Sequence, residues 1–122
     1  MIERVPVLRL GGDIIVSLQG DLEDTVALRL QDDLINEVAD HPTRGVVIDI
    51  SGLDVVDSFV GRVFGNLASM AKLLGSRVVL VGMRAEVAMT LVELGVLLDG
   101  IDTALNLERG IEVLKRSSDD AP

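Results

Sequence analysis

Apolar residues gather in short runs at the start of the chain, and small or polar residues separate these runs. Two runs lie close together at residues 5–10 and 14–18, with Gly11, Gly12 and Asp13 between them. Apolar runs on either side of a glycine-containing turn are typical of two antiparallel strands. We therefore predict two strands joined by a tight turn at this end of the chain.

The pattern then changes to a helical period and back to an extended one. Between Asp21 and the pair His41-Pro42, apolar residues recur every three or four positions, as on one face of a helix. These positions are Ala27, Leu30, Leu34 and Val38. Residues 46–50 form a nearly continuous β-branched run, which is typical of a strand covered on both faces. A second helical stripe occupies residues 60–74, and Gly75 is placed to end that helix.

The second half of the chain repeats this alternation. Its predicted elements are a strand at 78–81, a helix at 86–94, a short strand at 103–105 and a helix at 107–115 that Asn106 can cap. Strands that alternate with helices through short connections pair in parallel. We therefore predict an α/β fold, with a mostly parallel sheet of four or five strands and about four helices packed against it. A single domain is expected at residues 1–115, followed by a polar, frayed tail at 116–122.

Composition excludes several functional classes. The 122 residues include no Cys, no Trp, no Tyr and one His, which leaves no thiolate nucleophile, disulfide or multi-histidine metal site. The formal charge of -9 opposes nucleic acid, which requires a basic surface. No apolar run approaches the roughly 18 residues that span a bilayer, and the first residues lack a secretory pattern. We expect a soluble cytoplasmic protein that binds neither nucleic acid nor membrane.

In open α/β sheets, functional sites lie in the loops that lead from strands into helices. The loop predicted at residues 51–58 holds Asp54, Asp57 and Ser58 and opens into the best-defined helix. Ser58 falls at the predicted N-cap, where its hydroxyl can accept a backbone N–H bond worth about 1 kcal/mol. A phosphate on Ser58 would instead meet unpaired N–H groups and the positive end of the helix dipole. Arg62 lies one turn later and either pairs with such a phosphate or remains solvated.

Three acidic residues of this region offer a different interpretation. Asp49, Asp54 and Asp57 follow or end a predicted strand, where carboxylate oxygens are typical ligands of hard cations such as Mg²⁺. They form the only cluster from which a small α/β enzyme could be built. From position alone, the capped helix, the phosphorylated serine and the metal site all remain open.

The sequence Asp-Ile-Ser-Gly-Leu-Asp-Val-Val-Asp-Ser at residues 49–58 resembles the phosphorylation loop of STAS domains, the family of anti-sigma factor antagonists. The order of elements is also similar along nearly the whole chain. Simple antagonists usually carry Asp-Ser-Ser/Thr-Gly at this position, whereas Phe59 and Val60 follow the serine here and glycine comes only at Gly61. This departure favours the small single-domain STAS proteins of the bacterial stressosome. Further segments that carry this closer resemblance are 55–62, 81–83, 89–95 and 103–108.

The resemblance implies a STAS fold and a non-enzymatic regulator of the bacterial stress response. It implies that Ser58 is phosphorylated by an RsbT-like serine kinase, which the unmodified protein holds and the phosphorylated protein releases. Asp54, Asp57 and Arg62 would then contact the phosphate or the partner. The implied partners are RsbR-like STAS proteins in a large complex and an RsbX-like phosphatase, and we also expect self-association as a dimer. No cofactor, metal ion or catalytic residue is expected. The alternative is a stand-alone antagonist that binds an anti-sigma kinase directly.

Overall fold

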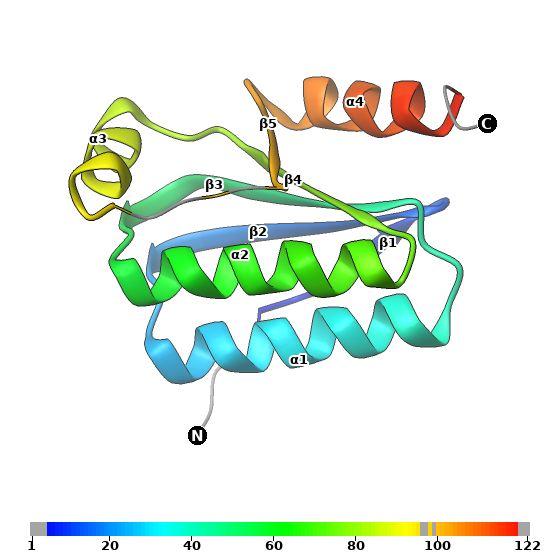
Figure 1. The fold of residues 1–122 in the computed structure, drawn as a ribbon, viewed down its shortest axis with the longest axis horizontal. Helices are drawn as coiled ribbons and strands as arrows, with labels where there is room; N and C mark the ends of the chain where they lie inside the picture. The colour runs from blue at the N-terminus through cyan, green and yellow to red at the C-terminus, as the bar shows by residue number, and fades with distance from the viewer. Residues whose placement is uncertain (1–4, 96–97, 99, 120–122) are drawn as a thin grey trace.

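The structure is a computed structural model that describes residues 5–95, 98 and 100–119 (Figure 1). A five-stranded sheet has the order β1-β2-β3-β4-β5, in which β1 is antiparallel to β2 and all other neighbours are parallel. The elements in chain order are β1 (Leu8–Leu10), β2 (Asp13–Asp21), α1 (Asp24–Asp40), β3 (Gly45–Val55), α2 (Ser58–Leu73), β4 (Arg77–Val81), α3 (Ala85–Glu93), β5 (Asp102–Ala104) and α4 (Leu107–Asp119).

Helices cover both faces of the sheet (Figure 1). The helices α1 and α2 lie against one face, α4 lies against the other, and α3 lies at the end where β3 finishes. The run Val46–Ile48 of β3 is apolar because both faces of the strand are covered. Val46 and Ile48 pack in the cluster on the α1 and α2 side, whereas Val47 packs with Leu114 of α4. The predicted α/β fold, with its antiparallel first strand and four helices, is confirmed.

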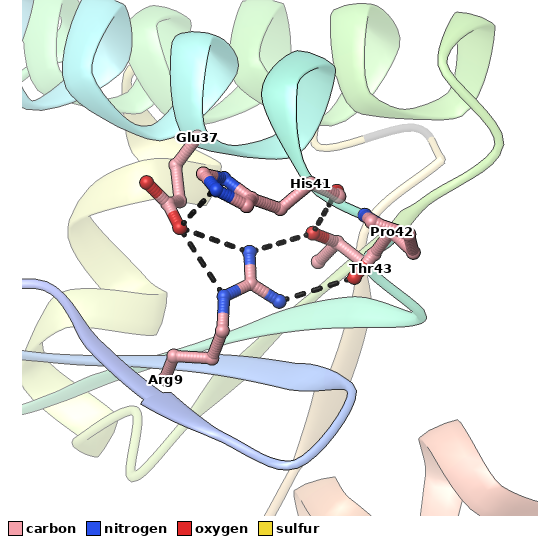
Figure 2. A network of polar contacts seen from close by, with 5 residues as sticks. All are labelled: Arg9, Glu37, His41, Pro42 and Thr43. Carbon is pink, nitrogen blue, oxygen red and sulfur yellow. Dashed lines mark hydrogen bonds and ion pairs between the residues drawn. The ribbon is translucent and has the colours of Figure 1, made fainter.

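Strand β1 is tied to the end of α1 by Arg9, as Figure 2 shows. The guanidinium donates to Oε1 of Glu37 from Nε at 3.2 Å and from Nη2 at 3.1 Å. It also donates to the carbonyl oxygen of Pro42 at 3.1 Å and to Oγ1 of Thr43 at 3.0 Å. Nδ1 of His41 lies 3.4 Å from the same Glu37 oxygen. The chain's one histidine therefore belongs to a network at the carboxyl end of α1, at the opposite end of the molecule from the start of α2 (Figure 1).

The predicted ends of the third strand and of the last helix are wrong. Strand β3 continues to Val55, so most of the loop predicted at 51–58 is strand. Ser51 and Gly52 resemble a turn, but β2 continues to pair with this segment as far as Asp21, after irregularities in the register. Helix α4 continues to Asp119 beyond the predicted end at residue 115, so residues 116–119 are helical. Residues 120–122 lie outside the described part.

Candidate functional site

Asp57 is the N-cap residue of α2. The prediction that Ser58 is the N-cap is wrong by one residue, because Ser58 is the first residue of the helix. Oδ1 of Asp57 accepts the backbone N–H of Val60 at 2.9 Å, and the Asp57 carbonyl oxygen accepts the N–H of Gly61 at 3.0 Å. A carboxylate at the N-cap satisfies one of the helix's unpaired donors. The partly buried Ser58 side chain is therefore not needed as the cap.

The first turn of α2 offers backbone N–H groups to a negative charge placed there. The first N–H groups of any helix lack intrahelical acceptors, and together they form the positive end of the helix dipole. The first turn of α2 contains no acidic residue of its own. Arg62 lies one helical turn after Ser58, is exposed, and forms no ion pair with another residue of the described ranges. A phosphate on Ser58 would thus meet backbone donors and have a cation on the same side of the helix.

Asp54 lies at the end of β3, and its side chain is 69% exposed. Oδ1 of Asp54 lies 4.0 Å from Nη2 of Arg84, and the same nitrogen donates to the carbonyl oxygen of Leu53 at 2.7 Å. Arg84 precedes α3 and was missed as a site residue in the sequence. The sequence does place a basic residue at position 84, three residues after the buried strand β4 and close to Gly82, which has a positive φ.

Asp49 has a different local partner from the other two acidic residues. Its Oδ1 accepts both the backbone N–H of Ser51 at 2.9 Å and the Ser51 hydroxyl at 2.7 Å. Asp49 thus holds the backbone of β3, Asp54 lies near Arg84, and Asp57 caps α2. Within the described ranges, no group of three or more His, Cys, Asp or Glu side chains is arranged to hold a metal ion. The cluster expected for a magnesium enzyme is therefore not formed by these carboxylates.

The fold and the site define an α/β domain of the STAS class. An antiparallel first strand leads into a parallel sheet, two helices cover one face, and a serine begins the second helix beside an acidic cap. The chain belongs to the STAS domain family, whose model matches residues 4–110. The predicted resemblance to this family is confirmed. In the part of the chain that the structure describes, no helix has the length and apolar character needed to cross a membrane.

Similar proteins with solved structures include an RsbS variant and a chain of a stressosome structure. The S58E variant of RsbS from Moorella thermoacetica is 37% identical, with a TM-score of 0.83, over 94% of this chain and 97% of that chain. A chain in a structure of the stressosome, described as a signal integration and transduction hub, is also 37% identical, with a TM-score of 0.76, over 93% of this chain and 98% of the other.

Among curated proteins, the RsbT co-antagonist protein RsbRA of Bacillus subtilis is 32% identical over 105 residues, which are 86% of this chain. The match covers 38% of RsbRA, so this chain spans well under half the length of that relative. The anti-sigma factor antagonist SpoIIAA in its unphosphorylated form has a TM-score of 0.73 but only 12% identity over 97% of this chain and 99% of that chain. SpoIIAA therefore shares the fold, and nothing more follows from that likeness.

Proposed function

We propose that this chain is a non-enzymatic, phosphorylation-switched component of a stressosome. In this proposal it holds an RsbT-like serine kinase and releases that kinase when Ser58 is phosphorylated. The observation that carries the proposal is the 37% identity to RsbS and to a stressosome chain over more than nine-tenths of both chains in each pair.

The geometry around Ser58 supports its assignment as the modified residue. Asp57 already caps α2 through Val60, so a phosphate on Ser58 would not remove the cap. Ser58 also lies at the carboxyl edge of a largely parallel sheet, where α1, α2 and α3 all begin (Figure 1). This edge is the usual position of binding sites in open α/β sheets.

Charge explains how the phosphate would release a partner without unfolding the protein. A phosphate adds about -1.5 to -2 charges at neutral pH. In the free protein, the helix dipole contributes about 0.3 to 1 kcal/mol in its favour, while repulsion from a carboxylate such as Asp57 costs about 1 kcal/mol at 4 Å in water. These contributions nearly cancel. At an interface that excludes water, the same repulsion rises to about 4 kcal/mol at an effective dielectric constant of 20, so binding is weakened far more than folding.

The proposed partners follow from the proteins to which this chain is similar. RsbR-like STAS proteins would assemble with it into a large cytoplasmic complex, as the 32% identity to RsbRA supports. An RsbX-like phosphatase would reset Ser58, and a second copy of the chain would form a dimer. Asp54, Asp57 and Arg62 would contact the phosphate or the kinase, because all three lie on or next to the segment that ends in Ser58.

The test is incubation with an RsbT-like kinase and ATP, followed by phosphosite mapping by mass spectrometry. The phosphate is expected on Ser58, and Ser58→Ala should abolish phosphorylation while the variant still binds the kinase in a pull-down. Ser69→Ala is the matched control, because Ser69 is an exposed serine of the same helix. A phosphate on Thr25, Ser51 or Thr90 in the Ser58→Ala variant would contradict the assignment.

Assembly is tested separately, by measuring particle size with and without an RsbR-like partner. The proposal predicts a large mixed complex that forms only when both proteins are present. A protein that stays small with the RsbR-like partner, and binds an anti-sigma kinase directly, would instead be a stand-alone antagonist.

A further inference from the structure

The end of β3 loses its neighbour on one side before the chain reaches Ser58. Pairing between β3 and β4 ends at Asp49 and Val81, although β3 continues to Val55. On the other side, β2 pairs with this segment through an irregular register. Backbone groups on the unpaired side of the strand need other partners. The last residues of β3 are therefore held less regularly than the rest of the sheet, and they lead directly into α2.

Arg84 supplies a partner on this side. Its Nη2 donates to the carbonyl oxygen of Leu53 at 2.7 Å, within a strand whose Leu53 side chain is fully buried. A hydrogen bond from a charged donor is stronger than one between neutral groups. The approach to Asp54, at 4.0 Å between side chains that are 45% and 69% exposed, contributes little because solvent screens it. The contact with the Leu53 carbonyl is therefore the important one.

The backbone before Arg84 is shaped to bring it to this position. Gly82 has a φ of +74°, and a Cβ built there would lie 2.8 Å from Cβ of Ser51 and 3.0 Å from Oδ1 of Asp49. Only glycine allows the chain leaving β4 to lie this close to β3 in this conformation. The carbonyl oxygen of Arg84 accepts the N–H of Ala88 at 3.0 Å, so the Arg84 backbone is also fixed at the start of α3.

From these contacts we infer that Arg84 is a positioning residue for the modification of Ser58, an inference that rests on the proposed function above. Arg84 holds the end of β3, and with it the start of α2, in the conformation that the kinase recognises. Without its side chain the segment samples other conformations, and the kinase binds only the ordered fraction. The apparent affinity falls with that fraction. KM for the protein substrate rises while kcat stays unchanged, because the bound conformation is the same.

The experiment compares Arg84→Ala, Arg84→Lys and a control, Arg109→Ala. Arg109 is an exposed arginine of α4 whose guanidinium is paired with Glu112. KM and kcat are measured for phosphorylation of Ser58 by the RsbT-like kinase, and hydrogen exchange of residues 53–57 is measured in the protein without kinase. For Arg84→Ala we expect KM to rise on the order of tenfold, as loss of one charged hydrogen bond would give. Exchange at 53–57 should accelerate, Arg84→Lys should restore part of both values, and Arg109→Ala should change neither.

Several results would overturn the inference. One is an unchanged KM in Arg84→Ala, and another is an equal change of KM in Arg109→Ala. A third is faster hydrogen exchange over the whole chain of Arg84→Ala together with a large drop in melting temperature, which would indicate a general structural role. If Arg84→Ala does not fold, KM is measured for Arg84→Lys instead, and the inference predicts a value above that of the wild-type protein. If the kinase does not modify Ser58 in the wild-type protein, the proposed function fails. Hydrogen exchange at 53–57 still tests whether Arg84 holds the segment, and unchanged exchange would refute it.

Discussion

A negative charge at residue 58 should stabilise the protein only after the charge of Asp57 has been removed. The Asp57 carboxylate accepts the N–H of Val60 at 2.9 Å, and this hydrogen bond holds its negative charge at the start of α2. Ser58→Glu places a second negative charge on the adjacent residue. Asp57→Asn removes the first charge while leaving an oxygen that can cap the helix equally well. These two substitutions and their combination form a double-mutant cycle.

The expected energies follow from the position of the two residues. In the wild-type background, Ser58→Glu gains about 0.3 to 1 kcal/mol from the helix dipole and loses up to about 1 kcal/mol by repulsion from Asp57 at 4 Å. The net change in the free energy of unfolding is therefore close to zero. In the Asp57→Asn background the repulsion is absent and the full dipole gain remains. The cycle should give an unfavourable coupling between the two charges of up to about 1 kcal/mol.

The assay is urea unfolding of the four proteins at low and at high salt. High salt should reduce the coupling, because the Debye length falls to about 3 Å at 1 M. The pair Asp57→Asn and Ser69→Glu is the control, since Ser69 is exposed on the same helix but three turns away. Coupling of the same size in the control pair, or none between residues 57 and 58 at low salt, would show that the Asp57 carboxylate does not act on residue 58. The electrostatic account of partner release would then fail.

Three further predictions concern the fold and the acidic cluster. Leu114→Ala should lower the free energy of unfolding by about 2 to 5 kcal/mol. Gly45→Ala, whose new Cβ would lie 2.3 Å from a Leu114 methyl group, should destabilise the Leu114→Ala protein less than it destabilises the wild-type protein. If urea unfolding shows that the two losses in free energy simply add, this packing is contradicted. Arg9→Ala should accelerate hydrogen exchange in β1 with a loss of only about 1 kcal/mol, because the network is exposed; unchanged exchange would show that Arg9 does not hold the strand. Magnesium chloride should leave the melting temperature unchanged, and a saturable rise would indicate a bound cation.

The order of elements could be predicted because each one carries its own periodic pattern. The stripe of α1 has a helical period because one face of the helix is buried, and the β-branched run of β3 is continuous because both of its faces are covered; both patterns are visible in the sequence. The start of α2 could be predicted to within one residue for the same reason. Asp57 and Ser58 are both good N-cap residues, so the sequence alone did not separate them.

The end of β3 and the role of Arg84 could not be predicted from local patterns. Ser51 and Gly52 are common in turns, and they remain in a strand only because β2 continues alongside them. The bond from Arg84 to the Leu53 carbonyl joins residues 31 positions apart and involves a backbone oxygen, which no side-chain motif identifies. Contacts of this kind depend on how β3 and the start of α3 lie in space, and only the assembled fold supplies that information.

The roles of Asp57 and Arg84 explain why Ser58 could act as a switch. A residue that is repeatedly modified must not be required for the fold, because each modification would otherwise unfold the protein. Asp57 caps α2, and Arg84 bonds to the strand that precedes it, so the backbone on both sides of Ser58 is held by other side chains. If Ser58 is the modified residue, as proposed, its phosphate changes the surface charge and leaves the fold in place. A partner would then respond to charge at a fixed position. A change in binding that follows a substitution at Asp57 can be attributed to charge only if the substitution preserves the cap.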